Sequence, residues 1–234
     1  DGDGTAFAKH AFKRSHPLYV VVTTDWDDAD TSDEALALQD DLHAEHDELL
    51  LTHFVGPYTF TDPEVSDDRE ALLVNWLKGM RDTHSDEIGL HIHPYCNFVE
   101  AAGGILGIAD IECNTTESTV NANDLTGYTI RCSAYSDEDF TNLLLAADKL
   151  FEEAGLGKPT SFRAGGWTAE LNTMRSLEAA GYVADTSANN WQRMEEWNGP
   201  FMGTLYAWNK EHWASIGDTS QPYYPSVDDI LVTG

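Results

Sequence analysis

The feature that most constrains the fold is a regular alternation of short apolar runs with longer amphipathic segments. Short apolar runs bounded by turn residues are typical of strands, whereas the longer segments follow N-capping serines and carry apolar residues at helical spacing. Strands that alternate with helices form a parallel sheet through right-handed crossovers. We therefore expect an α/β fold, with strands at 19–24, 48–55, 88–93, 160–163 and 182–186 and helices at 32–46, 66–83, 136–154 and 168–180.

Two regions fall outside this pattern. Residues 101–129 are rich in glycine, asparagine and threonine, and we expect them to form a long connecting insertion. Loops of that length are commonly functional or flexible. After Asn189 the sequence becomes aromatic and irregular. A length of 234 residues suits one barrel-like domain, so we expect residues 1–234 to form a single domain.

The charge balance narrows the class of partner. The chain has 41 acidic and 13 basic residues and a formal net charge of -28. Repulsion makes nucleic acid and anionic membrane surfaces poor partners for such a protein. The sequence contains no apolar run of about 18 residues that would predict a membrane span, and no signal-peptide pattern opens it.

The three cysteines, Cys96, Cys113 and Cys132, do not have the spacing of a zinc ribbon. One disulfide with one remaining thiol fits, and so do three reduced thiols. Cys113–Cys132 is the pair that we would test first.

A strand-like run ends in two histidines, His91 and His93, separated by one residue. Because alternate side chains of a strand share a face, both imidazoles should point the same way while Leu90 and Ile92 enter the core. Two imidazoles on one face indicate a metal site. A chance His-x-His pair is the alternative in a chain with nine histidines.

Another apolar run, 19–24, ends at acidic residues, of which Asp25 and Asp27 share a face. Parallel strands bring their C-terminal ends to one edge, where α/β sheets and barrels bind ligands. If the two runs are neighbours, a divalent ion with His, His and Asp ligands and one open position would be a hydrolytic arrangement. A solvated acidic loop, in which Asp25 only caps a turn, is the alternative.

Four segments resemble the motifs of the polysaccharide deacetylase family, the NodB-homology carbohydrate esterases. They occur in the family's order between about Val20 and Pro225, at 23–27, 87–93, 161–167 and 181–187. The resemblance implies a distorted (β/α)7 barrel that holds one divalent metal ion, usually zinc. It also implies that the partner is an acetylated carbohydrate, whose N-acetyl amide or O-acetyl ester is hydrolysed.

The resemblance also assigns roles to individual residues. Asp25 is implied as the general base, and Asp27 as the carboxylate ligand of the metal together with His91 and His93. The acids of the first motif are separated by one residue here, so Asp28 remains a rival of Asp27 as the ligand.

Two further residues are implied to support the site. Arg163 would pair with Asp25, and Asp185 would support the residues that contact the reacting groups. An arginine in a short strand also commonly forms a surface ion pair. Asp185, which is followed by Thr186, also fits an Asx-turn.

The chain departs from the family pattern in two places. The family's usual spacing would place the second histidine at Tyr95, whereas here it falls at His93. The family's last motif, a Leu-His strand that supplies the general acid, has no clear counterpart before Gly234. The only late histidine, His212, lies in an aromatic segment, so we expect either another acid or a missing last strand.

Aromatic residues are frequent at the expected strand ends and in the late segment. Aromatic faces stack on the apolar faces of sugar rings, so Trp26, Trp167 and Tyr95 are expected to contact substrate. Any one of these rings could instead belong to the core, which is the commoner place for tryptophan.

These patterns together favour a zinc-dependent polysaccharide deacetylase of the extracellular space or the cell envelope, with the cytoplasm as the alternative location. One alternative function is a weakly catalytic carbohydrate-binding or structural module on the same barrel. Another is hydrolysis of a different carbon–nitrogen amide bond.

Overall fold

A parallel sheet of five strands forms the centre of the molecule. The computed structural model describes residues 20–120, 123–198 and 204–234. The strands lie in sequence order, and each pairs in parallel with the next. They are β1 (Val22–Asp25), β2 (Leu51–Val55), β3 (Glu87–Ile92), β4 (Ser161–Ala164) and β5 (Ala184–Asp185). The expected α/β class with a parallel sheet is confirmed.

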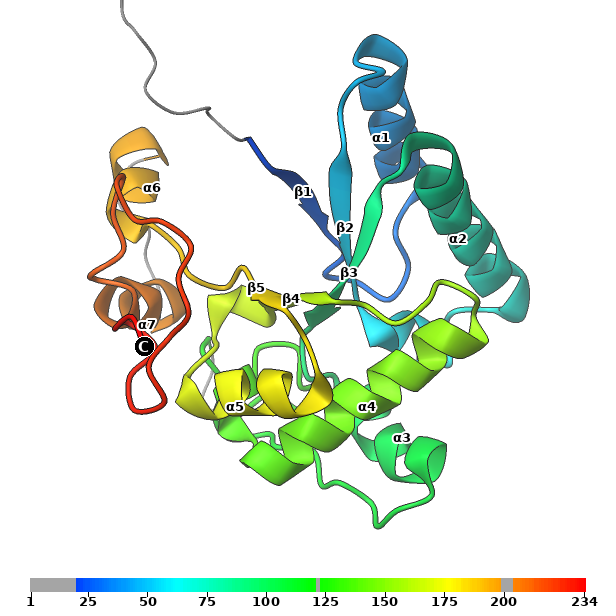
Figure 1. Cartoon of the computed structure of the whole chain (residues 1–234). Coiled ribbons are helices and arrows are strands. Elements are labelled where there is room, and N and C mark those ends of the chain that lie inside the picture. The colour runs from blue at the N-terminus through cyan, green and yellow to red at the C-terminus, as the bar shows by residue number, and fades with distance from the viewer. Residues whose placement is uncertain (1–19, 121–122, 199–203) are drawn as a thin grey trace, which may run out of the picture.

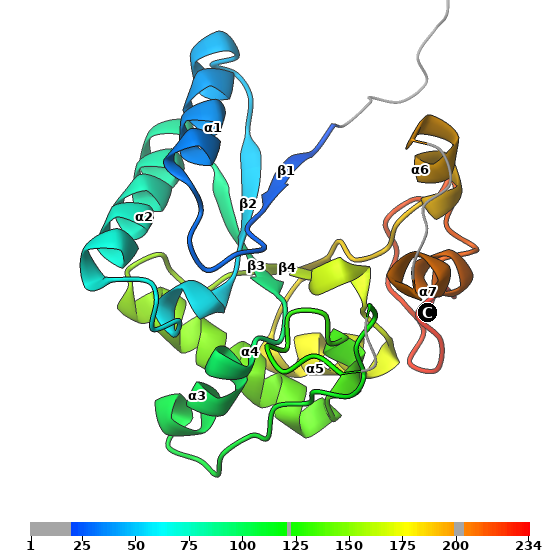
Figure 2. The same cartoon turned by 180° about the vertical axis from the view of Figure 1, so that it is seen from behind.

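Helices connect the strands and cover the sheet. They are α1 (Asp33–Glu45), α2 (Asp67–Gly79), α3 (Cys96–Leu106), α4 (Asp137–Glu153), α5 (Leu171–Ala180), α6 (Trp191–Asn198) and α7 (Thr204–His212). Figures 1 and 2 show α1 and α2 side by side near β2 and β3, with α6 and α7 set apart near the C-terminus. Ser66 and Ser136 cap α2 and α4 as predicted, because each side-chain oxygen accepts a hydrogen bond from the third residue after it.

Two stretches differ from the sequence-based expectation. The expected insertion at 101–129 begins inside α3, a helix that the pattern did not reveal because two of its residues are glycines. Gly103 is needed there, since a Cβ atom on it would lie 2.8 Å from the Cα of Asp110. The segment after Asn189, expected to be irregular, contains α6 and α7.

The sheet curls strongly from one edge to the other. In a flat sheet, spacings of about 4.8 Å would put β1 and β4 roughly 14 Å apart, with side chains perpendicular to the sheet. Yet the guanidinium of Arg163 in β4 donates hydrogen bonds to Thr23 and Asp25 of β1, at 2.8 and 2.6 Å. These contacts require the inner face to be concave, so side chains from non-adjacent strands meet there.

The opposite face of the sheet packs against the helices. Leu90, Ile92 and Phe162 are fully buried in one apolar cluster with residues of α2, α3 and α4. Gly89 faces the inner side, where a Cβ atom would lie 2.7 Å from the ring of Phe54. The alternation along β3 therefore places apolar side chains on the helical face of the sheet. The inner face carries the polar residues of β3 and the ring of Phe54 from β2.

A buried carboxylate, Asp86, ties the start of β3 to α1 and β2. Its Oδ2 atom accepts hydrogen bonds from Nε2 of His43 and of His53, at 2.7 and 2.9 Å, and its Oδ1 atom accepts one from Leu51 N–H. The three side chains are at most 1 % exposed. Nδ1 of His53 is 3.0 Å from Thr24 Oγ1, so His53 also links the network to β1.

The disulfide joins a different pair from the one favoured by the sequence. Cys96 and Cys113 are bonded, and Cys132 is a buried thiol, so the expected Cys113–Cys132 pair is wrong. The thiol of Cys132 instead contacts the carbonyl oxygen of Ile92 at 3.1 Å, behind the end of β3. The disulfide fastens the first residue of α3 to the segment that follows this helix.

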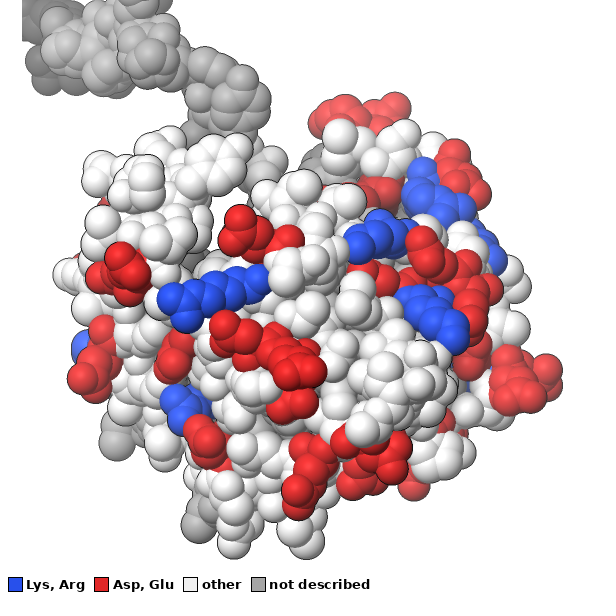
Figure 3. Space-filling model, turned by 60° about the horizontal axis from the view of Figure 1, so that its bottom comes forward, with Lys and Arg blue, Asp and Glu red and all other residues white. Residues whose placement is uncertain are grey.

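The surface carries the acidic excess. Figure 3 shows a face on which acidic side chains dominate and basic ones lie among them. In the described parts of the chain, no helix combines the length and apolar character that crossing a membrane requires.

Asp86→Ala is expected to lower the free energy of unfolding by about 3–5 kcal/mol, because it leaves buried donors without their acceptor. Urea denaturation at pH 7 measures the loss. Asp41→Ala, on the exposed surface of α1, is the control and should change the value by about 0.5 kcal/mol or less. A loss no larger than that of the control would contradict the role assigned to Asp86.

The same network predicts a pH dependence. Burial raises the pKa of Asp86, but hydrogen bonds from Leu51, His53 and His43 outweigh burial, and the pKa lies below its usual range. The stabilisation is therefore complete above the ordinary carboxyl pKa and is lost as the pH falls through the lower folded-state pKa. The difference in stability between wild type and Asp86→Ala should shrink at acid pH, as measured by urea denaturation across a pH series.

Candidate metal centre

The two histidines lie at the C-terminal end of β3 and point to the inner face. His91 is the fifth residue of the strand, and His93 follows its last residue. Leu90 and Ile92, which alternate with them, are 0 % exposed in the core. The predicted alternation is confirmed, and the two imidazole centroids lie 5.0 Å apart.

Asp27 reaches the same place from the end of β1. The preceding residue, Trp26, anchors this segment, because its N–H donates to the carbonyl oxygen of Phe54 at 2.9 Å and its ring is buried. The hydroxyl of Tyr58 donates to the carbonyl oxygen of Trp26, and that of Tyr95 donates to the carbonyl oxygen of Asp27. The main chain of Asp27 is thus held from both sides, while its side chain is half exposed.

Three potential ligand atoms converge at this end of the sheet. Asp27 Oδ1 lies 3.0 Å from His91 Nε2 and 3.4 Å from His93 Nε2. In the described residues, this is the one group of three or more metal-ligating side chains whose ligand atoms all lie within 4.8 Å of one another. Asp28, the rival ligand, is exposed and is not a member of the group.

The second nitrogen of each imidazole is already engaged. His91 Nδ1–H donates to the carbonyl oxygen of Arg163 at 2.9 Å, and His93 Nδ1–H donates to that of Tyr128 at 2.7 Å. A carbonyl only accepts, so each Nδ1 carries the proton, and in a neutral ring Nε2 then offers a lone pair. Metal-binding histidines are commonly oriented in this way.

The charge state of the group fits a cation. His91 and then His93 hold the pKa of Asp27 well below its usual range, so this carboxylate is ionised. Burial lowers the pKa of His93 and favours its neutral form. Hydrogen bonds between the two imidazoles and Asp27 cause this shift of the carboxylate pKa, and a bound cation would take the place of the protons in those bonds. This donor set fits a divalent metal ion, and two imidazoles with a carboxylate are typical ligands of zinc.

Asp25 is the last residue of β1, two residues before Asp27, and is paired with Arg163. Nη1 of Arg163 is 2.6 Å from Asp25 Oδ1, and the two side chains are 14 % and 24 % exposed. Nε of Arg163 donates to Thr186 Oγ1 at 3.0 Å, and the guanidinium carbon lies 4.4 Å from the ring centroid of Phe54. The pair is therefore held in the concave face and is not an open surface ion pair.

Asp185 forms a local turn at the end of β5. Its two carboxylate oxygens accept hydrogen bonds from the hydroxyl and the N–H of Ser187, at 2.6 and 3.0 Å. Burial raises its pKa to about 6, although the Ser187 bonds and the charge of Arg163 oppose the rise. These contacts are those of an Asx-turn. Asp185 is connected to the site by its electrostatic interaction with Arg163.

The three aromatic residues expected to contact substrate occupy different environments. Trp26 is 2 % exposed and packs near Trp76, so it belongs to the core and does not line a groove. Trp167 is half-buried against Trp191, at 5.6 Å between ring centroids, and its carbonyl oxygen accepts from Trp213. Only Tyr95 lies at the metal centre, with its ring centroid 6.5 Å from that of His93.

Two other histidines, His53 and His212, do not join the centre. His53 turns to the helical side of the sheet and bonds Asp86. His212 stacks on Trp208 and contacts Trp213, at 4.3 and 4.4 Å between ring centroids. These contacts do not bring His212 to the metal ligands, so they offer no support for it as the general acid.

Two residues outside the group of Asp27, His91 and His93 shape the centre. Tyr128, from the segment expected to be an insertion, stacks its ring on His93 at 4.4 Å between centroids. Gly165 lies behind His93, where a Cβ atom would be 2.7 Å from the imidazole and from the carbonyl oxygen of Ile92. The Gly165-Gly166 pair was a visible signal of close packing, whereas Tyr128 had none.

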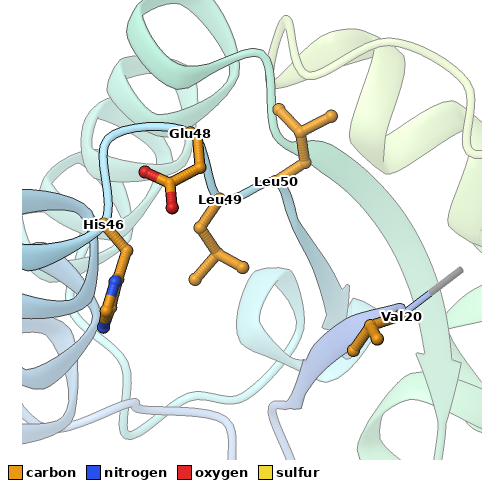
Figure 4. Close-up of a pocket in the computed structure, with 5 residues that line it drawn as sticks. All are labelled: Val20, His46, Glu48, Leu49 and Leu50. Carbon is orange, nitrogen blue, oxygen red and sulfur yellow. The ribbon is translucent and has the colours of Figure 1, made fainter. Parts of the chain in front are cut away.

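A surface pocket lies at the other end of the strands. Val20, His46, Glu48, Leu49 and Leu50 line it, at residues that precede β1 and β2 (Figure 4). The metal-ligating group is at the C-terminal ends of the strands, so this pocket is separate from it.

No protein-family model matches this chain, and no curated protein gives a significant sequence match.

Gly165→Ala is expected to lower the free energy of unfolding by about 1–3 kcal/mol, because its Cβ would overlap the ring of His93. Gly104→Ala is the matched control: the space around Gly104 is open, and alanine favours a helix. Urea denaturation of both variants tests the packing. Equal stability of the two variants would contradict the close contact at Gly165.

Proposed function

We propose that this chain is a metal-dependent hydrolase that removes acetyl groups from an N- or O-acetylated carbohydrate. The observation that carries the proposal is the convergence of Asp27, His91 and His93 beside the Asp25–Arg163 pair. The motif resemblance to polysaccharide deacetylases assigns compatible roles to the same five residues. The curled parallel sheet is compatible with part of a (β/α)7 barrel, which we include in the proposal.

The ligands favour zinc as the metal. Imidazole nitrogens suit zinc, and catalytic zinc sites commonly use three protein ligands and keep a position open. When bound, a divalent ion supplies Lewis acidity, which polarises a carbonyl group and makes water more acidic. In the protein, the main-chain carbonyl oxygens of Arg163 and Tyr128 keep the two Nε2 atoms directed at Asp27.

Asp25 is the proposed proton acceptor for the attacking water. Arg163 donates a charge-assisted hydrogen bond to one of its oxygens, Oδ1, at 2.6 Å. The other oxygen, Oδ2, is the proposed site of proton transfer. Because Thr23 and Thr186 also bond Arg163, the guanidinium is fixed, and it can hold Asp25 in one orientation.

Tyr95 is the proposed contact for substrate at this centre. Its hydroxyl donates to the main chain of Asp27 at 3.3 Å, and its ring packs 5.4 Å from that of Tyr128. Burial raises the pKa of Tyr95 well above its usual range, so the hydroxyl stays protonated. A flat apolar ring with a polar tip suits a sugar, which presents apolar ring faces and hydroxyl groups.

The disulfide supports a location outside the cytoplasm. Structural disulfides persist mainly in oxidising compartments, and Cys96–Cys113 is bonded here. We therefore place the proposed hydrolase in the extracellular space or the cell envelope.

A carbohydrate-binding module without turnover is the second candidate function. The observation that favours it is the position of His212, whose ring contacts are with Trp208 and Trp213 and not with the metal ligands. Protonation of the leaving group would then lack the histidine that the family uses. Turnover separates the two functions, because both keep the metal.

The first test is metal content. Elemental analysis of purified wild type should find about one zinc per chain after loading, as expected for a single group of three ligands. His91→Ala and His93→Ala should each lose the metal, whereas His46→Ala, an exposed histidine of the remote pocket, should keep it. Absence of a stoichiometric metal in wild type would exclude the hydrolase.

The second test is turnover. Loaded wild type should release acetate from acetylated chito-oligosaccharides or from O-acetylated xylan. Asp25→Asn should keep the metal and lose about 10²–10⁴-fold in kcat, because it removes only the base. Loss of metal in this variant would indicate that Asp25 is the metal ligand and Asp27 the base. Metal without acetate release from any acetylated glycan would favour the binding module.

A further inference from the structure

We propose that the turn formed by residues 124–129 is a positioning element for His93, with Tyr128 as the residue that makes the contact. The inference rests on the metal site proposed above and does not depend on the substrate. It gives a role to the segment between α3 and α4, whose described residues contribute no member of the Asp27, His91 and His93 group.

Tyr128 holds His93 in two ways. Its carbonyl oxygen accepts the Nδ1–H of His93 at 2.7 Å, which selects the tautomer with a free Nε2. Its ring stacks on the imidazole with an interplanar angle of 23° and a centroid separation of 4.4 Å. The hydrogen bond sets the rotation of the ring, and the stacking limits its tilt.

The carboxylate of Asp124 fixes the turn that carries Tyr128. Oδ1 accepts hydrogen bonds from the N–H and the hydroxyl of Thr126, at 2.9 and 2.7 Å. Oδ2 accepts the same two kinds of bond from Thr129, at 2.8 and 2.6 Å. Asp124 thus accepts four hydrogen bonds, two from Thr126 before Tyr128 and two from Thr129 after it. These bonds restrict the movement of the Tyr128 carbonyl group.

The turn is also fastened to the chain that leaves β3. Cys96 N–H donates to the carbonyl oxygen of Thr126 at 2.8 Å, and the Cys96–Cys113 disulfide ties the same residue to the segment before the turn. Gly127 has a φ of +83°, and a Cβ atom on it would lie 2.1 Å from the carbonyl oxygen of Pro94. The turn therefore lies directly against the residues that follow His93.

The two histidines are consequently positioned by different parts of the structure. The carbonyl oxygen that orients His91 belongs to Arg163, inside the sheet. The carbonyl oxygen that orients His93 belongs to Tyr128, outside the sheet. A change in the turn should therefore disturb His93 and leave His91 in place, which distinguishes positioning from a general loss of stability.

Zinc affinity tests the proposal. Asp124→Ala should bind zinc about 10–100-fold more weakly than wild type in a competition titration with a chromophoric chelator, as found when partners of metal-binding histidines are removed. Thr129→Val keeps the side-chain shape and removes one of the four bonds to Asp124, together with the hydroxyl contact to Ser118, and should show a smaller loss in the same direction. Ser136→Ala removes the cap of α4, and it controls for lost stability with unchanged affinity.

Nuclear magnetic resonance of the histidine rings supplies a readout that stability alone would not move. Wild-type His93 should carry its proton on Nδ1, and Asp124→Ala should show a mixture of Nδ1–H and Nε2–H tautomers at His93 but not at His91. Tyr128→Phe keeps the ring and the carbonyl and should behave as wild type, whereas Tyr128→Ala loses the stacking and should weaken zinc binding.

Wild-type affinity and an unchanged His93 tautomer in folded Asp124→Ala would overturn the positioning role. If that variant does not fold, wild-type affinity and tautomer in Thr129→Val would overturn it equally. Absence of zinc binding by wild type would overturn the metal site and the positioning role together. Zinc binding without acetate release would affect only the proposed reaction, because the titrations and spectra do not use substrate.

Discussion

The candidate site depends on two hydrogen bonds that its histidines donate to main-chain carbonyl oxygens. These bonds, from His91 to Arg163 and from His93 to Tyr128, direct both Nε2 atoms at Asp27. Without them the same three side chains could pair as ordinary charged groups. With them, each ring that loses its Nε2 proton offers a lone pair beside the Asp27 carboxylate, so a cation would replace the proton that otherwise joins the two groups. The strand ends bring the residues together, and the carbonyls determine what they can bind.

Much of the site could be predicted because strands have a period of two. The spacing of His91 and His93 determined their common face, and parallel strand ends meet at one edge, which brought Asp27 to them. The same rule also argues against Trp26 as a substrate contact. A residue between Asp25 and Asp27 points the other way in an extended chain, and the ring of Trp26 is indeed in the core.

Other parts of the structure leave no signal in the side-chain pattern. Tyr128 acts through its carbonyl oxygen, which every residue has, so its identity does not reveal the contact. Cysteine spacing does not determine pairing, and the partner of Cys113 depends on the helix α3, whose glycines conceal it. The curl of the sheet, which the contacts of Arg163 with Thr23 and Asp25 reveal, has no counterpart in any local sequence pattern, although the motif resemblance implied the Arg163–Asp25 pair.

The Arg163–Asp25 pair joins residues 138 positions apart and closes the concave face of the sheet. Contacts of such sequence separation form only after the intervening chain has been ordered, because closing a long loop costs entropy before it brings stabilisation. The strands β1, β2 and β3 can pair in order along the chain, whereas Asp25 and Arg163 meet only when β4 has joined them. The proposed hydrolysis would therefore become possible only at a late step of folding, and a nascent chain that has not yet assembled β4 would lack it.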